Sequence, residues 1–188
     1  MSKTGKSDRQ DNFFNVCGQC KISCCKDARP PVSPKRRKLI EDYLAKNPVQ
    51  GVKPPYFTRE NQYTHPREDK DGFCVFYNKE TRLCRIHQIK PETCVAGPIT
   101  FDVNPKTKEL EYYLKMEKIC PLAGKIHKAK DGTLEKHLAS AKGEIRRLVT
   151  DIEPESLKAI LTIEEPDTFK VDQEELAGEK KKLVAAKP

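Results

Sequence analysis

The sequence predicts an α+β fold, in which a small loop-rich cysteine-cluster domain with short β-hairpins and a few helices precedes a C-terminal helical extension. Pairs of short β-rich runs around polar turns are typical of hairpins. Two separate stretches carry apolar residues at helical spacing. Only 36% of the residues are apolar, 34% are charged and there is no Trp. We therefore expect a modest apolar core, which cross-links through the eight cysteines would help to hold.

A first helix is predicted at residues 34–46, with the sequence PKRRKLIEDYLAK. Ser33 is a suitable N-cap and Pro34 suits the first helical position. The apolar stripe consists of Leu39, Ile40, Tyr43 and Leu44, and Asn47-Pro48 ends the helix. The basic run from Lys35 to Lys38 falls in the first turn, where the helix dipole disfavours it. It forms either a solvated face or a contact with an anionic partner.

Two hairpins are predicted in the middle of the chain. FCVFYNKETRLCRIH, residues 73–87, places two β-rich runs around a polar turn, and residues 97–103 and 110–116 form a second pair around Asn104–Lys108. Residues 48–72 are polar and contain Pro54-Pro55, so they are expected to form loop or weak strand.

The last third of the chain is predicted to be helical and then extended. The residues of one apolar stripe recur at spacings of four and three, and they are Leu134, Leu138, Ala141, Ile145 and Leu148. Pro154 begins a second, short helix. We expect a disordered tail at 1–12, the cysteine-cluster domain at 13–128, a helical extension at 129–165 and a charged flexible tail at 166–188.

The bulk composition favours a cytoplasmic protein. There is no apolar run long enough to cross a membrane, and the polar start lacks the apolar stretch of a secretory signal. Thiols stay reduced in the cytoplasm, so clustered cysteines there more often bind metal or do redox chemistry than form structural disulfides. The disulfide alternative is the weakest, although an even number of cysteines permits it. The net charge of +8 counts every thiol as neutral, so it overstates the case for a nucleic-acid partner.

The cysteine pattern predicts a metal site. Cys17 and Cys20 have the spacing at which two sulfurs bind one metal ion, and Cys24 is within reach of the same ion. Adjacent side chains point apart, so Cys24 and Cys25 are expected to divide between two nearby centres. The remaining four cysteines then complete two sets of four, and they are Cys74, Cys84, Cys94 and Cys120.

Histidine and carboxylate side chains are alternative ligands in the sequence. His87 follows Cys84 at an acceptable spacing, but a structural histidine is the simpler interpretation because eight sulfurs suffice. Asp27 is the nearest carboxylate to the first cluster, although Asp is common in such loops for turn reasons. We expect the other three histidines, His65, His127 and His137, to lie at the surface.

From Phe13 to Cys120 the sequence resembles the YkgJ-type cysteine-cluster proteins, which are described as having a zinc- or iron-chelating domain. The resemblance rests on Cys17-x2-Cys20-x3-Cys24-Cys25 and on the blocks VSPKRRKLIEDYL, DGFCVFYNKETRLCRIH and KPETCVAGPITFDV. It implies chelation by the cysteines of these blocks, whereas Cys120 matches a later family cysteine less closely. The family's usual CxxCxxCC has one residue fewer, and it usually has Tyr at the position of His87. Lys90-Pro91 replaces its Arg-Pro, which weakens any bidentate contact. The longer spacing is also similar to the cysteine motif of flagellin lysine methylases.

Sets of four thiolates suit both zinc and iron–sulfur clusters. A structural zinc site usually draws its ligands from two tight knuckles, whereas here a single CxxC is joined by widely spaced cysteines. Such dispersal favours an iron–sulfur cluster, of the [4Fe-4S] type, over Zn²⁺.

We expect a metal-binding protein that acts in chelation, cluster handling or electron transfer for a protein partner. One alternative is a metal-dependent enzyme related to the cysteine-cluster lysine methylases, although no Ser/His/Asp or Walker-type constellation supports catalysis. Another is a zinc-stabilised module that binds nucleic acid or protein, for which the basic runs and Tyr56, Phe57 and Tyr63 supply weak support.

Overall fold

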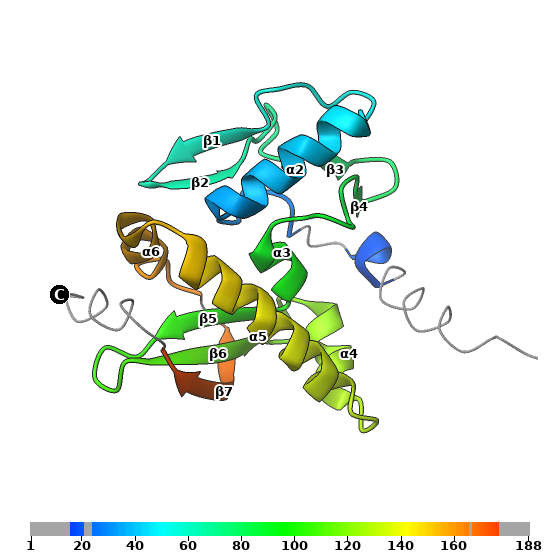
Figure 1. Ribbon diagram of the computed structural model, residues 1–188. Coiled ribbons are helices and arrows are strands. Elements are labelled where there is room, and N and C mark those ends of the chain that lie inside the picture. The colour runs from blue at the N-terminus through cyan, green and yellow to red at the C-terminus, as the bar shows by residue number, and fades with distance from the viewer. Residues whose placement is uncertain (1–15, 21–23, 166, 177–188) are drawn as a thin grey trace, which may run out of the picture.

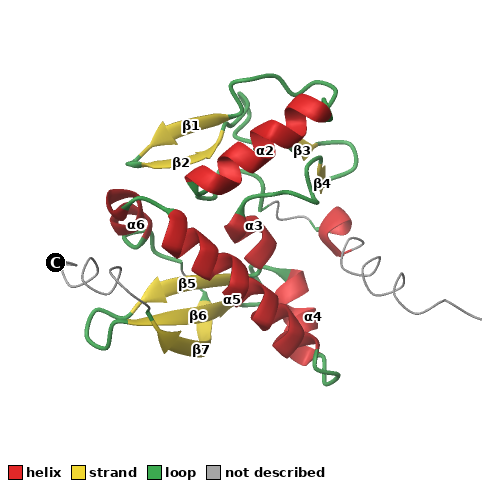
Figure 2. Cartoon of the chain, in the orientation of Figure 1, coloured by secondary structure: helices red, strands yellow, loops and turns green. Residues whose placement is uncertain are grey.

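The computed structural model describes residues 16–20, 24–165 and 167–176, and it has two stacked halves (Figure 1). Helix α2 and two small hairpins form the upper half. A three-stranded sheet, covered by α5, forms the lower half, and α3 lies between them (Figure 2). The elements are α2 (Pro34–Lys46), β1 (Phe57–Glu60), β2 (Tyr63–Pro66), β3 (Tyr77–Asn78), β4 (Leu83–Cys84), α3 (Glu92–Ala96), β5 (Ile99–Val103), β6 (Glu109–Lys115), α4 (Pro121–Lys128), α5 (Thr133–Asp151), α6 (Pro154–Ile160) and β7 (Thr168–Glu175).

The predicted α+β class is confirmed, and α2 begins and ends as the sequence indicates. The hydroxyl of Ser33 accepts a hydrogen bond from the Arg36 amide at 3.2 Å, and the amide of Asn47 donates to the carbonyl of Tyr43. Ile40 and Leu44 are fully buried in the upper core, which also contains Val32, Phe57, Phe76 and Ile86. Leu39, which the predicted stripe included, is 53% exposed, so the buried face of α2 is narrower than expected.

The two predicted hairpins are present, and a third occupies part of residues 48–72. Strands β3 and β4 pair, as do β5 and β6, where Ile99 lies opposite Leu114. The additional hairpin joins β1 and β2 through Asn61-Gln62, both with positive φ. That geometry matches the right-handed twist of the strands. Each of its strands has only four residues, which is too short for a clear alternation of apolar and polar side chains. The sequence therefore indicated loop or weak strand there.

The lower core joins the sheet to the C-terminal helices. The predicted stripe on α5 places Ala141, Ile145 and Leu148 against Leu110 and Leu114 of the sheet. The predicted short helix after Pro154 is also present as α6. Helix α5 therefore shares one core with residues from the cysteine-containing part of the chain. None of the helices among the described residues is both long and apolar enough to cross a membrane.

The expectation of a charged tail after Pro166 is wrong for residues 168–175. These residues form β7, which pairs antiparallel with β6. Phe169 and Val171 pack against the lower core. Two acidic residues of β7, Asp172 and Glu174, meet cations of α5, and Lys142 lies 2.8 Å from Asp172. The charges that made this segment look like a tail are thus neutralised across the sheet. The predicted tail at 1–12, and the part of the C-terminal tail at 177–188, lie outside the described residues.

Polar contacts join the two halves at α3. The Ser33 hydroxyl donates to the carboxylate of the fully buried Glu92 at 2.6 Å. The Arg36 guanidinium donates to the Lys90 carbonyl and forms an ion pair with Glu144 of α5. Because the same Ser33 hydroxyl caps α2, one side chain fixes the start of that helix and its position on α3.

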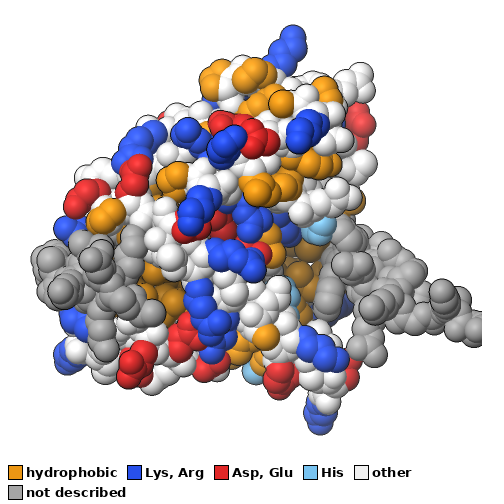
Figure 3. Space-filling view, in the orientation of Figure 1, with side chains coloured by type: hydrophobic (Ala, Val, Ile, Leu, Met, Phe, Trp, Pro, Cys, Tyr) orange, Lys and Arg blue, Asp and Glu red, His pale blue; other side chains and the backbone are white. Residues whose placement is uncertain are grey.

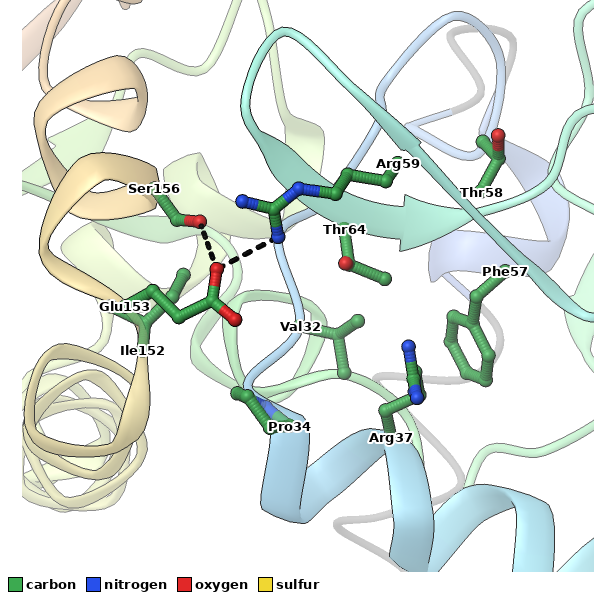
Figure 4. Close-up of a pocket in the computed structure, with 10 residues that line it drawn as sticks. All are labelled: Val32, Pro34, Arg37, Phe57, Thr58, Arg59, Thr64, Ile152, Glu153 and Ser156. Carbon is green, nitrogen blue, oxygen red and sulfur yellow. Dashed lines mark hydrogen bonds and ion pairs between the residues drawn. The ribbon is translucent and has the colours of Figure 1, made fainter.

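A groove of about 240 Å³ opens between the halves, beside α2, β1, β2 and α6 (Figure 4). The Arg59 guanidinium and the Ser156 hydroxyl converge on the carboxylate of Glu153, at 2.8 and 3.3 Å. Neither cysteine nor histidine is among the ten residues that line it. The groove therefore separates the two halves without contributing a metal ligand.

We predict that Ser33→Ala lowers the free energy of unfolding by about 2 kcal/mol or more, because it removes a helix cap and leaves the buried Glu92 carboxylate without its hydroxyl donor. Urea denaturation followed by circular dichroism measures this. Ser140→Ala, on the exposed face of α5, is the control and should change stability by less than about 0.5 kcal/mol. Equal stability of the two variants would contradict the prediction.

Candidate metal centre

All eight predicted cysteines lie among the described residues, and none of the eight forms a disulfide there. They come from separate segments of both halves: the helical turn at 16–19 and the residues that follow it, the loop after β2, the end of β4, helix α3 and the residue before α4. Cys74 and Cys84 pack against the upper core and Cys120 against the lower core. The fold thus brings these thiols to the junction of the two halves.

Cys25 and Cys74 face each other across a short antiparallel pairing. Lys26 is bridged to Phe73, so Cys25 lies opposite Cys74, whose amide donates to the Cys25 carbonyl at 2.8 Å. Directly opposite residues in such a pair project their side chains to the same face. The two thiols therefore lie side by side.

Cys84 and Cys94 belong with this pair, and we call Cys25, Cys74, Cys84 and Cys94 the first group. Burial raises the pKa of Cys74 to about 12, and the charge of Cys84 adds to the effect. Burial also raises the pKa of Cys94, to which Cys74 and Cys84 then contribute. Mutual repulsion of this kind arises between neighbouring sulfurs.

The second group consists of Cys17, Cys20, Cys24 and Cys120. Poor solvation raises the pKa of Cys17, and the nearby sulfurs of Cys24 and Cys120 raise it further. Cys120, which precedes α4, interacts in the same way with Cys24 and Cys20. Cys24 also acts on Cys84 and Cys94 of the first group, so it lies at the boundary between the groups.

Backbone amides prepare three of the sulfurs for the thiolate form. The sulfur of Cys74 accepts a hydrogen bond from the amide of Phe76, and the sulfur of Cys84 accepts one from the amide of Ile86. The sulfur of Cys120 accepts hydrogen bonds from the amides of Leu122 and Ala123. Hydrogen bonds to the charged form favour it, and they also tune metal centres held by thiolates. This observation fits a bound metal or cluster, because such groups are ligated by deprotonated sulfur.

The adjacent cysteines are electrostatically different. The Cys25 thiol donates a hydrogen bond to the Cys24 sulfur, so the expectation that these two side chains point apart is wrong. The bond lowers the pKa of Cys24 to about 6 and raises that of Cys25. The ammonium groups of Lys90 and Lys115 lower the pKa of Cys24 further. Cys24 is also exposed. It is therefore the thiol that exists as an accessible thiolate at neutral pH before metal binds.

Lys90 is the cation that the two groups share. Its charge lowers the pKa of Cys17 and Cys24 in the second group and of Cys84 and Cys94 in the first. In the sequence, Lys90 stands out only because Lys90-Pro91 replaces the usual Arg-Pro of the family. Its role follows from the fold, since the Arg36 bond to its carbonyl holds the segment between the thiols.

The remaining candidates have structural surroundings. Partial desolvation and then the charge of Lys90 lower the pKa of His87. The His137 ring lies 3.2 Å from the Ala96 carbonyl. His127 packs edge-on against Phe169. Asp27 is a turn residue with φ of 51°, and its carboxylate fills the space beside Gly72.

The expectation that His65 lies at the surface is wrong, since the residue is 1% exposed. It shares a face of β2 with Tyr63, and its ring packs against the Tyr63 ring at 5.7 Å. That face is buried, which a polar stretch of sequence did not indicate.

The grouped thiols do not yet form a closed ligand cage. Within residues 16–20, 24–165 and 167–176, no three side chains of Cys, His, Asp or Glu converge closely enough to hold a metal ion. The sulfurs of each group would therefore have to move toward one another when a metal binds.

Comparison with known proteins assigns the chain to a family. Residues 16–121 match the CxxCxxCC family, whose description reads "Putative zinc- or iron-chelating domain". The chain is also similar to the uncharacterized protein MJ0661 of Methanocaldococcus jannaschii, with 30% identity over 117 residues. That alignment covers 61% of this chain and 63% of the relative. No solved structure matches the chain.

The chain belongs to the CxxCxxCC family, since the match covers more than half of its length, as the resemblance predicted. The match begins just before Cys17 and ends just after Cys120, so it includes all eight thiols. Metal binding follows as the general property of this site, and the surrounding fold supplies the amide donors and the cation that thiolate ligation needs.

We predict that Cys24 is alkylated fastest in reduced, metal-free protein, with a midpoint near pH 6. A lowered pKa leaves the reactive thiolate in place above that pH and removes it below. Cys25→Ala should move the midpoint up toward about 8.5, the ordinary value for a thiol. Iodoacetamide labelling followed by mass spectrometry measures both. Cys74, with a pKa of about 12, is the internal control and should stay unlabelled at pH 7.

Proposed function

We propose that this protein binds iron, as an iron–sulfur cluster, or zinc at two adjacent centres, each held by four cysteine thiolates. The observation that carries the proposal is the grouping of eight thiols into two sets at the junction of the halves. The first group supplies Cys25, Cys74, Cys84 and Cys94, and the second supplies Cys17, Cys20, Cys24 and Cys120. Adjacent Cys24 and Cys25 then serve different centres.

The dispersal of the ligands supports an iron–sulfur cluster over zinc. In the first group, the four sulfurs come from a short pairing segment, the end of β4 and helix α3. A polynuclear cluster is wide enough to be reached from several segments, whereas a zinc ion is usually held by tight knuckles. We therefore favour [4Fe-4S] in at least one group, with Zn²⁺ as the alternative.

Access to the second group supports a role in exchange with a protein partner. Cys17 and Cys24 are both exposed, and Met116 and Ile119, close in sequence to Cys120, expose apolar side chains. A partner that docks there would reach the thiolate of Cys24 directly. Transfer of a cluster from one protein to another requires such an approach.

The basic run on α2 gives little support to nucleic-acid binding. Each of its four cations lies beside a carboxylate of the same chain, and the pairs are Lys35 with Asp151, Arg36 with Glu144, Arg37 with Glu41 and Lys38 with Asp42. Figure 3 shows Lys and Arg side chains interleaved with Asp and Glu on this face. A phosphate backbone would have to compete with these carboxylates.

The direct test is metal and acid-labile sulfide analysis, with an absorption spectrum, on protein purified without oxygen. Iron with matching sulfide and a broad band near ~400 nm would support the cluster. Zinc without sulfide would support the alternative. Protein that binds neither metal through its thiols would overturn the proposal.

We predict that Cys84→Ser and Cys120→Ser each lose one centre and keep the other, so that each variant retains about half of the bound metal. The two cysteines belong to different groups, so the double variant should lose nearly all metal. Elemental analysis of the purified proteins measures this. Loss of all metal from either single variant would mean that one centre, rather than two, is built from the eight sulfurs.

Removal of metal by a chelator is expected to lower the melting temperature by more than about 5 °C, because ligand binding to the folded state alone stabilises it. The proposed centres connect the two modest cores, so loss of the metal should destabilise both cores. Thermal circular dichroism before and after chelation measures the change. An unchanged melting temperature would show that the metals do not support the fold.

A further inference from the structure

Glu68 lies in a row with Cys25 and Cys74. Residues 67–69 pair antiparallel with residues 73–75, and Glu68 is bridged to Cys74. The amide of Val75 donates to the Arg67 carbonyl at 2.9 Å, and the amide of Asp69 donates to the Phe73 carbonyl at 2.7 Å. These bonds flank the Glu68–Cys74 pair, which is therefore a non-hydrogen-bonded pair, the type whose side chains approach most closely.

The side chain of Glu68 thus projects to the same face as the thiols of Cys74 and Cys25. Its charge reaches the sulfur, because Glu68 raises the pKa of Cys74. Among the described residues, Glu68, Cys74 and Cys25 thus form a row across three paired segments. The two thiols of this row belong to the first group.

One oxygen of Glu68 is held and the other has no partner. Oε2 accepts a hydrogen bond from Nε of Arg29 at 3.2 Å, and Arg29 is fixed in turn by an ion pair with Glu60 at 3.4 Å. Oε1 is buried and accepts no hydrogen bond from any described residue. A buried carboxylate oxygen without a donor is costly, and more so beside thiolates. A bound cation would remove both costs.

We propose that Oε1 of Glu68 is an additional donor at the first centre, which therefore presents four sulfurs and one oxygen, whereas the second presents four sulfurs. This rests on the proposed thiolate centres. Carboxylate oxygen is a harder ligand than thiolate and binds both iron and zinc, so a fifth donor of this kind is compatible with either metal proposed for the first centre. Arg29 orients the carboxylate, as groups outside the ligand shell commonly do.

The two centres can be distinguished with ¹¹³Cd²⁺ as the probe, because its NMR shift depends on the balance of sulfur and oxygen donors. Wild-type protein loaded with two equivalents should give two signals, one in the all-sulfur range and one displaced toward oxygen ligation. Glu68→Gln should move only the displaced signal. It should also weaken binding of one equivalent by about 10–100-fold in chelator competition.

Asp71→Asn is the matched control, because it removes an exposed carboxylate of the same segment that pairs with Lys79 rather than with Arg29. It should move neither signal and change affinity less than about threefold, within the range expected for an exposed ion pair. Two all-sulfur signals in the wild type, or a displaced signal unmoved by Glu68→Gln, would overturn the role of Glu68 and leave the thiolate centres intact.

Absence of any sulfur-ligated ¹¹³Cd²⁺ would instead overturn the proposed function itself. Should Glu68→Gln fail to fold, the wild-type spectrum decides the question, since the oxygen donor is visible in the unaltered protein.

Discussion

The hydrogen bond between the Ser33 hydroxyl and the buried Glu92 carboxylate is the contact on which the arrangement of the thiols depends. It fixes the start of α2 on the start of α3, and α3 carries Cys94. The neighbouring bond from Arg36 to the Lys90 carbonyl holds the shared cation beside both groups. Two short polar contacts thus place the upper core, one ligand and the compensating charge relative to one another.

Crowding of the sulfurs makes it costly to form several thiolates in the metal-free site. Burial and the neighbouring sulfurs raise the pKa of Cys74 and Cys94, so these thiols stay protonated at neutral pH, whereas Cys24 has a lowered pKa. Metal binding must therefore release protons from the first group. The backbone amides that point at Cys74, Cys84 and Cys120 reduce this cost without adding charge.

Local structure could be predicted from the sequence wherever local rules decide it. Ser33 and Pro34 define the start of α2, and the stripe on α5 defines its buried face. Strand β7 could not be predicted, because its acidic residues are neutralised by Lys142 and Arg146 of a distant helix. The cysteines were recognisable from spacing. Glu68 was not, since only the pairing of residues 67–69 with 73–75 places it beside Cys74.

Strand β7 also has a consequence for how the chain is made. Domains fold as their residues leave the ribosome, the N-terminal parts first. All eight cysteines leave the ribosome before Thr168–Glu175, yet β6 pairs with that strand in the complete lower sheet. The nascent chain therefore exposes its full set of thiols before the lower core can close. The thiols are therefore open to metal, and to oxidation, before the lower core is complete.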